Sequence, residues 1–282
     1  MPQPQSLVRA LRRVIPSGGA SPVDAGLLAR ARELNDGLLS DVRSIPEDVL
    51  EDFTRTITEF CRKREYSEEY TEAWIPHRYR LYLTLEWLKT LVDGPAVGVE
   101  TGGSSIVTDL LQRHFPRAKW LNTANDLRER WEFDDDFADV IVCTEVLEHL
   151  SDPPEGVQDS FQQTGLVAML KECHRILKPG GCLFATTPNA ASVWHLESVL
   201  DGTPPWYYHL HVREYTIPEL SGLLGSLGFD VERCRAVHCL PVDEARSAVD
   251  HTRAFAILLE HGFDTENRGD DAFLVARKRA DA

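Results

Sequence analysis

The fold class of this chain is decided by two stretches, D-V-I-V-C-T-E-V-L-E-H-L-S-D-P (residues 139–153) and E-C-H-R-I-L-K-P-G-G-C-L-F-A-T-T-P-N (residues 172–189). Residues 140–143 are a short β-branched run, which is typical of a strand buried on both faces of a parallel sheet. Helical apolar spacing follows over residues 166–177, a Pro-Gly-Gly sequence ends it, and residues 182–187 predict the next buried strand. Together these elements predict one βαβ unit.

Three chemically active side chains follow the first of these strands. Glu145, Glu148 and His149 stand at i, i+3 and i+4, so a helical backbone there would place them on one face. Open α/β sheets bind their ligands at the carboxyl ends of the strands. The segment therefore predicts part of a functional site, although any α/β protein can contain a helix, a Pro-Gly-Gly corner and a strand.

The same stretches resemble class I S-adenosylmethionine-dependent methyltransferases. In that superfamily a strand ending in E-x-x-E-H is followed by a helix, an L-K-P-G-G turn and a strand ending near T-P-N, and the resemblance covers roughly residues 93–278. It implies an α/β fold with a doubly wound, mostly parallel, seven-stranded sheet. It also implies a methyltransferase enzyme that uses S-adenosylmethionine, with a role in biosynthesis.

The overall composition and net charge restrict the kinds of partner that this chain can bind. The chain has 282 residues, 43% hydrophobic content and a formal net charge of −15. An acidic surface repels phosphates, so the charge argues against nucleic acid as a partner. The sequence contains no apolar run long enough to span a bilayer and no signal core at its start, which predicts a soluble, cytoplasmic protein. The six cysteines lack any C-x-x-C pair and are expected to be reduced.

The chain divides at a predicted turn near residue 93. Residues 1–92 are expected to form an N-terminal helical cap or extension, and residues 93–282 the S-adenosylmethionine-binding domain. Within that domain we expect an irregular, aromatic substrate loop over residues 190–215 and a helical insertion over residues 239–269. The rings of the N-terminal segment either line the substrate pocket or pack this segment onto the sheet.

The cofactor residues are implied by the resemblance. Relatives end the first strand with an acid followed by G-x-G-x-G; here Glu100 has the acidic position, Gly102 the first glycine, and Ser104 replaces the second. Asn122 stands where relatives have the acid that binds the ribose, and the segment after it is short for the usual helix and third strand. The expected cofactor-binding residues are Glu100, Thr101, Gly102, Gly103, Ser104, Asp126, Leu127, Thr144 and Glu145.

The acceptor side is predicted from rings and histidines. Aromatic residues after the carboxyl end of a strand can bury a flat or apolar substrate, and imidazoles supply acid–base chemistry. The candidate substrate residues are Trp194, Tyr207, Tyr208 and Tyr215. The candidate catalytic bases are His149, His209 and His211.

A metal is a further expectation from the resemblance. Glu145, Glu148, His149 and His211 resemble the E-x-x-E-H segment plus distant histidine of magnesium-dependent small-RNA 2′-O-methyltransferases and ubiquinone-pathway O-methyltransferases. Such a set can hold Mg²⁺ or another divalent cation that lowers the pKa of a bound hydroxyl. The alternative is that the two glutamates are helix-start acids and that His149 is hydrogen-bonded locally.

The functional prediction is methyl transfer to an oxygen, nitrogen or carbon of a small-molecule metabolite, assisted by a base or a metal. One alternative is a metal-dependent 2′-O-methyltransferase acting on RNA. Another is a non-catalytic methyltransferase-like binding or partner subunit, because the glycine loop and the second-strand acid depart from the family pattern. A homodimer is an open alternative. A dinucleotide-dependent dehydrogenase is disfavoured because the first loop lacks G-x-G-x-x-G.

Overall fold

The structure is a computed structural model that describes residues 25–103, 105–123, 125–152, 163–239 and 250–280. The helical insertion predicted over residues 239–269 falls partly outside these ranges. Its described part contains α11, Thr252–Glu260.

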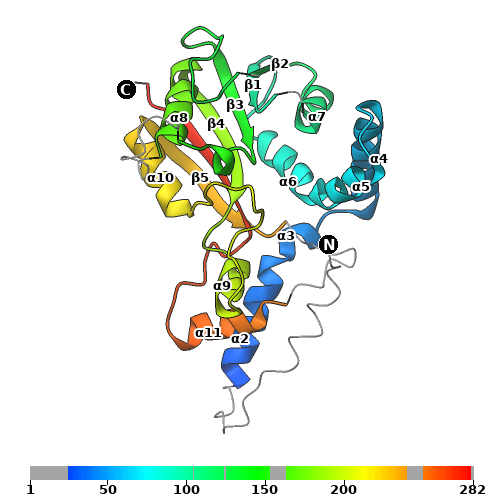
Figure 1. Ribbon diagram of the computed structural model, residues 1–282, viewed down its shortest axis with the longest axis vertical. Coiled ribbons are helices and arrows are strands. Elements are labelled where there is room, and N and C mark those ends of the chain that lie inside the picture. The colour runs from blue at the N-terminus through cyan, green and yellow to red at the C-terminus, as the bar shows by residue number, and fades with distance from the viewer. Residues whose placement is uncertain (1–24, 104, 124, 153–162, 240–249, 281–282) are drawn as a thin grey trace.

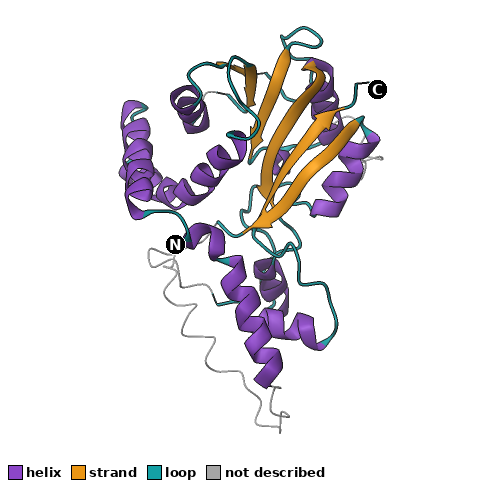
Figure 2. Ribbon diagram, turned by 180° about the vertical axis from the view of Figure 1, so that it is seen from behind, coloured by secondary structure: helices purple, strands orange, loops and turns teal. Residues whose placement is uncertain are grey.

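A six-stranded sheet forms the centre of the described chain (Figures 1 and 2). The strand order is β2-β1-β3-β4-β6-β5, in which β2, β1, β3 and β4 are parallel and β6 is antiparallel to both of its neighbours. The strands are β1 Val97–Thr101, β2 Lys119–Thr123, β3 Ala138–Thr144, β4 Leu177–Pro188, β5 Phe229–Val237 and β6 Asp271–Lys278.

The helices cover both faces of the sheet and extend beyond one of its ends. They are α2 Ala25–Leu38, α3 Ser40–Arg43, α4 Glu47–Lys63, α5 Glu68–Trp74, α6 Arg78–Leu88, α7 Ile106–His114, α8 Thr164–Ile176, α9 Val193–Leu200, α10 Ile217–Ser226 and α11 Thr252–Glu260. Two short 3₁₀ helices, η2 Ile75–His77 and η3 Leu147–His149, complete the described elements.

Alternation along the strands divides the core into two layers. Val140, Val142 and Phe184 pack on one face with α4, α6 and α7, whereas Ile141 and Leu183 pack on the other with α8 and α10. Because neighbouring residues of a strand point to opposite faces, the continuous apolar runs read from the sequence are explained by burial on both sides. The expected doubly wound α/β architecture is confirmed.

A helical lobe lies beyond the carboxyl ends of the parallel strands (Figures 1 and 2). It consists of α2, α9 and α11, three segments that are far apart in the sequence. Their apolar side chains share a third core that includes Ala31, Val193, Phe255 and Leu258. The helical lobe continues directly from the sheet, since α9 follows β4 and α11 precedes β6. It therefore faces the edge where ligands of α/β folds bind.

The prediction of seven strands is wrong for the described chain, which forms six. The segment between β2 and β3 is too short for a helix and a further strand, and it forms turns instead. Trp131 anchors this segment: its side chain is 2% exposed and its Nε1–H donates to the Leu127 carbonyl at 3.2 Å.

The prediction of an irregular loop over residues 190–215 is wrong in its first part, which contains α9. Ser192 caps this helix by accepting a hydrogen bond from the His195 N–H at 3.1 Å. Serine is a favoured N-cap residue, so Ser192 was a signal for the start of a helix. The aromatic residues of the segment led to the prediction of a loop instead. The division into residues 1–92, 93–282 and an insertion at 239–269 stays a prediction.

Candidate functional site

A glycine turn connects β1 to α7 at the carboxyl edge of the sheet. Gly102 and Gly103 have φ values of +97° and +86°, which L side chains rarely adopt. Ser105 then caps α7 in a capping box with Thr108. The turn presents the amino-terminal end of a helix, which favours a negatively charged ligand group. Ser104 lies outside the described residues.

Glu100 supports this turn from within the protein. It is 2% exposed, and its carboxylate accepts hydrogen bonds from Ser105 Oγ at 2.7 Å, from Thr108 Oγ1 at 2.5 Å and from the Asn122 amide. Burial raises the pKa of Glu100 to about 7, although these three donors oppose the shift. Glu100 therefore braces the turn, and Asn122 completes the brace in the place where the resemblance expects a ribose-binding acid.

Asp126 and Leu127, expected on the ribose or adenine side, follow β2. The Asp126 carboxylate accepts hydrogen bonds from the Arg128 guanidinium at 2.6 Å and 2.8 Å, which lower its pKa to about 2. Leu127 is half-buried against the core that contains Trp131. Thr123, at the end of β2, is fully buried, and its Oγ1 has no hydrogen-bond partner among the described residues.

Glu145 lies just beyond β3 in a left-handed conformation, with φ of +53°. Thr186 fixes it twice: the Glu145 N–H donates to the Thr186 carbonyl at 2.9 Å, and Thr186 Oγ1 donates to Glu145 Oε1 at 2.7 Å. Arg80 of α6 reaches the same Oε1 with its guanidinium at 3.2 Å. The half-buried Thr144 precedes this turn and pairs with Thr186.

Glu148, His149 and His211 form a compact group of potential ligands. One ligand atom of each lies within 4.8 Å of the others, and Nε2 of His149 is 3.7 Å from Oε1 of Glu148. Glu148 is fully buried, and its Oε2 accepts from Thr187 Oγ1 at 2.8 Å. Its Oε1 has no hydrogen-bond partner in the part of the chain that the structure describes. Glu145, the fourth predicted metal ligand, is not part of this group.

The electrostatics favour the uncharged forms of Glu148 and His149 in the absence of a cation. Burial, together with the neighbouring Glu145 carboxylate, raises the pKa of Glu148 above its usual range. Burial and the nearby His211 lower the pKa of His149. A neutral imidazole has a free lone pair, so His149 is suited to accept a proton or to bind a metal.

The backbone of Glu148 holds the segment that carries His211. Its carbonyl oxygen accepts hydrogen bonds from the Val212 N–H at 2.8 Å and from the Arg213 N–H at 3.2 Å. The rings of His149 and His211 consequently meet edge to face, with 4.9 Å between their centroids. Two segments more than sixty residues apart are thus brought together at one point.

Glu214 holds His211 from its other side. Its carboxylate accepts from His211 Nδ1 at 2.6 Å, from the Tyr207 N–H at 2.8 Å and from His195 Nε2. Burial opposes ionisation, but the hydrogen bonds from the two histidines prevail and lower the pKa of Glu214 to about 2. Glu214 is therefore a buried anion with three donors.

The predicted aromatic residues do not form one surface. Trp194 and Tyr207 stack with 4.3 Å between centroids, and Tyr208 is 45% exposed beside His209. His209 is also exposed and is not part of the group formed by Glu148, His149 and His211. Tyr215 is 2% exposed within the core, where burial raises its pKa to about 12.

Comparison with known proteins identifies the chain. A family model described as "Methyltransferase domain" matches residues 83–233, which is more than half of the sequence. The chain belongs to this family.

Two curated relatives and a solved structure are similar to this methyltransferase domain. A probable S-adenosylmethionine-dependent methyltransferase of Mycolicibacterium smegmatis is 35% identical over 94 residues, 33% of this chain and 29% of that protein. The ubiquinone biosynthesis O-methyltransferase of Pseudomonas syringae pv. tomato is 39% identical over 67 residues, 24% of this chain and 22% of that protein. The chain thus spans less than a third of the length of either relative.

The solved structure is a Haloferax volcanii methyltransferase in complex with the Trm112 activator. Its sequence identity to this chain is 15%, the TM-score is 0.47, and the alignment covers 72% of this chain and 92% of that one.

Two residues of the site were missed by the sequence analysis. Arg80 lies in a predicted helical segment that consists mostly of apolar residues, so nothing in the sequence marks it as a site residue. It is 5% exposed. Glu214 is three residues after His211, and that spacing is the one signal that could have found it. The sequence around Arg80 and Glu214 does not reveal that both charged side chains are buried. Their burial is the reason that they matter for the electrostatics of the site.

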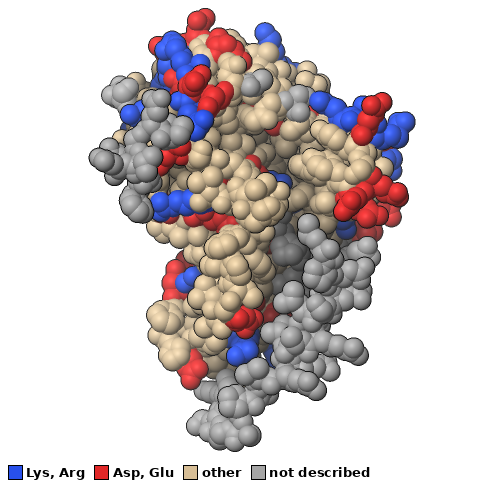
Figure 3. Space-filling model, viewed as in Figure 1, with Lys and Arg blue, Asp and Glu red and all other residues tan. Residues whose placement is uncertain are grey.

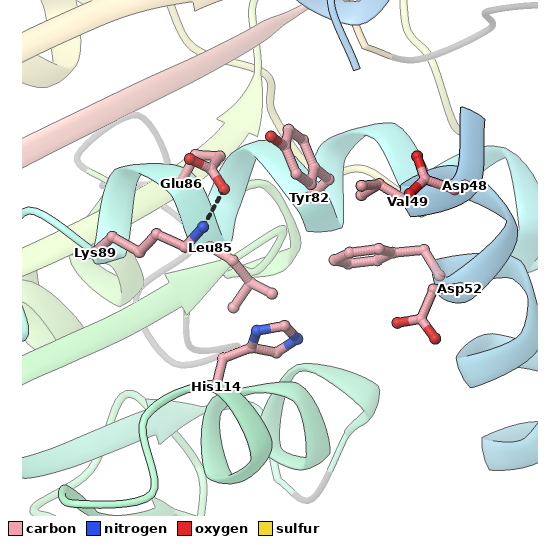
Figure 4. Close-up of a pocket in the computed structure, with 9 residues that line it drawn as sticks. Asp48, Val49, Asp52, Tyr82, Leu85, Glu86, Lys89 and His114 are labelled. Atoms are coloured by element: carbon pink, nitrogen blue, oxygen red, sulfur yellow. Dashed lines mark hydrogen bonds and ion pairs between the residues drawn. The ribbon is translucent and has the colours of Figure 1, made fainter. Parts of the chain in front are cut away.

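A pocket of about 370 Å³ lies elsewhere, between α4, α6 and α7 (Figure 4). Phe53, Tyr82 and Leu85 form its apolar part, and His114 borders it at the end of α7, away from the carboxyl edge of β1. Lys89 is paired with Glu86 within this pocket. It is therefore separate from the residues that carry the candidate chemistry.

No helix among the described residues has the length and apolar character needed to cross a bilayer. All six cysteines are unpaired in the structure, and five of them are buried.

Proposed function

We propose that this methyltransferase domain transfers the methyl group of S-adenosylmethionine to a nucleophilic atom of a small-molecule acceptor. The observation that carries the proposal is the convergence of Glu148, His149 and His211 at the carboxyl edge of the sheet that also bears the glycine turn. A sulfonium activates its own methyl group, so the protein has to position the reactants and remove a proton where needed.

The residues at the glycine turn fit the donor molecule. The methionine carboxylate would lie at the amino-terminal end of α7, beside Gly102 and Gly103, where an added Cβ at Gly103 would meet no atom within 4 Å. The unpaired, buried Oγ1 of Thr123 suits a ribose hydroxyl at the end of β2. Thr101, Ser104, Asp126, Leu127 and Thr144 remain further candidates on this side.

The group of three on the acceptor side fits either a base or a divalent cation. An orphaned carboxylate oxygen and two imidazoles are ligands that Mg²⁺ or a softer divalent metal can use. Such a cation, when bound, supplies Lewis-acid lowering of the pKa of an acceptor hydroxyl. Without it, His149 or His211 can take the acceptor proton directly.

The charge of the chain favours a small acceptor over RNA. On the face drawn in Figure 3, acidic and basic side chains of the described residues are interspersed, and the formal net charge is −15. RNA binding would need a concentrated basic surface. The stacked Trp194 and Tyr207 suit a flat or apolar acceptor, and the relative named as an O-methyltransferase favours an oxygen nucleophile.

A non-catalytic binding subunit is the second candidate, and one observation favours it. The Asn122 amide is engaged by Glu100 and by the Gly103 carbonyl at 3.2 Å, so the usual ribose-binding acid is absent. Detection of methyl transfer to any acceptor would exclude this candidate.

Calorimetric titration tests the proposal. S-adenosylmethionine and S-adenosylhomocysteine are titrated into the full chain with magnesium and with chelator, and we expect micromolar binding of both. Glu148→Ala should remove any magnesium-dependent part of the signal, whereas the exposed control Glu129→Ala should not. Absence of binding to the folded protein would refute the enzymatic assignment.

A further inference from the structure

Glu214 is the centre of a hydrogen-bonded chain that runs from the aromatic pair to the candidate site. The Tyr207 hydroxyl lies 3.2 Å from Ser192 Oγ, which lies 2.6 Å from His195 Nδ1. His195 Nε2 meets one oxygen of Glu214, and His211 Nδ1 meets the other. The side chains of His195, His211 and Glu214 are 6%, 8% and 4% exposed. The protein therefore supplies nearly all of their hydrogen-bonding surroundings.

The positions of the protons in this chain follow from the chemistry of the carboxylate. An ionised carboxylate can only accept, so both imidazole nitrogens that contact Glu214 must carry hydrogen. In its neutral form His195 then has its hydrogen on Nε2, and its Nδ1 is the acceptor for Ser192 Oγ. His211 has its hydrogen on Nδ1, which leaves the lone pair on Nε2.

That distribution matters for the group formed with Glu148 and His149. Because Nδ1 of His211 is committed to Glu214, Nε2 is the nitrogen available to a proton or a cation. A histidine that donates its other N–H to a carboxylate has a fixed tautomer and ring orientation and is more basic as a ligand.

We propose that Glu214 is a positioning residue, which with His195 and Ser192 fixes the Nδ1–H tautomer of His211 and directs its Nε2 into the site. The inference deepens the proposed function, on which its catalytic meaning rests. Glu214 itself touches neither donor nor acceptor and acts through His211. Ser192 also caps α9, and Tyr207 stacks on Trp194. Through these two contacts the orientation of His211 is linked to the position of the Trp194 and Tyr207 rings.

A purely structural role for Glu214 is the competing explanation, and the tautomer of His211 separates the two. Long-range proton–nitrogen NMR correlation of ¹⁵N-labelled imidazoles identifies which ring nitrogen carries hydrogen. At mildly alkaline pH, where free imidazole is neutral, we expect His211 as the Nδ1–H tautomer in the unmodified chain. Assignment follows from the loss of one signal set in His211→Gln. An Nε2–H tautomer for His211 would overturn the inference without any variant of Glu214 having to fold.

The chain offers a matched control. Glu197 accepts a hydrogen bond from Nδ1 of the buried His251 at 2.7 Å, in the helical lobe and outside the candidate site. Glu214→Leu, which removes the hydrogen-bond acceptor at similar volume, should abolish the fixed tautomer of His211, whereas Glu197→Leu should leave the His211 signals unchanged. Unchanged His211 signals in folded Glu214→Leu would contradict the inference.

Metal titration provides the second readout. If the unmodified chain binds Mn²⁺ or Co²⁺, Glu214→Leu should weaken this binding about 10- to 100-fold, and Glu197→Leu should not. Equal affinity in Glu214→Leu would overturn the positioning role. The NMR experiment needs neither donor nor acceptor, so the expected tautomer in a chain without transfer activity would count against the proposed function alone.

Discussion

Replacement of Arg80 by methionine should destabilise the protein strongly. The Arg80 side chain is 6% exposed, and its Nη1 lies 3.2 Å from Glu145 Oε1, while its Nη2 lies 3.3 Å from His77 Nδ1. Asp271 and Glu148 are further buried acids whose charges act on this guanidinium. Methionine preserves much of the volume but leaves these carboxylates without their nearest cation.

The magnitude follows from that geometry. At an effective dielectric constant of ~20, two unit charges 3.2 Å apart attract by roughly 5 kcal/mol. Removal of one member of a buried ion pair typically costs about 3–5 kcal/mol, because the remaining charge stays desolvated. We therefore expect the free energy of unfolding of Arg80→Met to fall by about 3–5 kcal/mol at neutral pH. Urea denaturation followed by circular dichroism measures it.

The effect should also depend on pH. Burial and the Glu145 charge raise the pKa of Asp271 well above its usual range, and Arg80 opposes this shift. A carboxyl whose pKa is raised on folding reduces stability as pH rises above its unfolded value. Below its raised native pKa, Asp271 is protonated with or without Arg80, so the deficit of Arg80→Met should grow once the pH rises above that pKa. The exposed Arg30, paired with Glu33 on α2, is the control, and Arg30→Met should change little. A loss below about 1 kcal/mol for Arg80→Met would refute the reasoning.

Three further predictions concern backbone shape and one buried acid. Gly102→Val should abolish S-adenosylmethionine binding in calorimetry while the fold persists, because φ is +97°; wild-type affinity would disprove the assignment. Gly98→Ala should lower the free energy of unfolding by at least about 1–3 kcal/mol, since its Cβ would lie 2.2 Å from the Trp120 ring, and Gly222→Ala, which meets nothing within 4 Å, serves as the control in the same denaturation assay. Burial raises the pKa of Glu100 from 4.5 to about 7, so wild-type stability should fall by roughly 3 kcal/mol over this interval, and thermal unfolding of Glu100→Gln should lack that pH dependence.

The strands and most helices could be predicted because their causes are local. β-branched runs, the Pro-Gly-Gly corner after Ile176 and the acids at the start of α4 act over a few residues. The prediction of a seventh strand came from the resemblance to the superfamily. It was wrong because the segment between β2 and β3 is too short to form a further strand. The helix α9 was missed because the aromatic composition of the segment was interpreted as a substrate loop, and the capping signal of Ser192 was not used.

The candidate site was predictable in its chemistry but not in its partnerships. Glu148, His149 and His211 lie close together in the structure, and their roles as ligands or bases stay predictions. Glu145 was separated from them by a left-handed turn and by Arg80, which the sequence could not indicate. Burial and long-range hydrogen bonds depend on which segments contact one another in the folded chain. Local sequence periodicity does not reveal these contacts.

The position of β6 has a consequence for how the chain assembles during synthesis. β6 lies between β4 and β5, and among the described strands β5 pairs with β6 alone. A nascent chain that ends after β5 must leave that strand without a neighbour, held to the growing protein by α10. The same delay affects the residues around the site, because Asp270 and Asp271 are synthesised only with β6. Asn189, which directly follows β4, donates its N–H to the Asp270 carbonyl at 2.8 Å. Pairing over such sequence distances is slow, so we expect a folding intermediate that already has its parallel strands but still exposes an unpaired edge of β4.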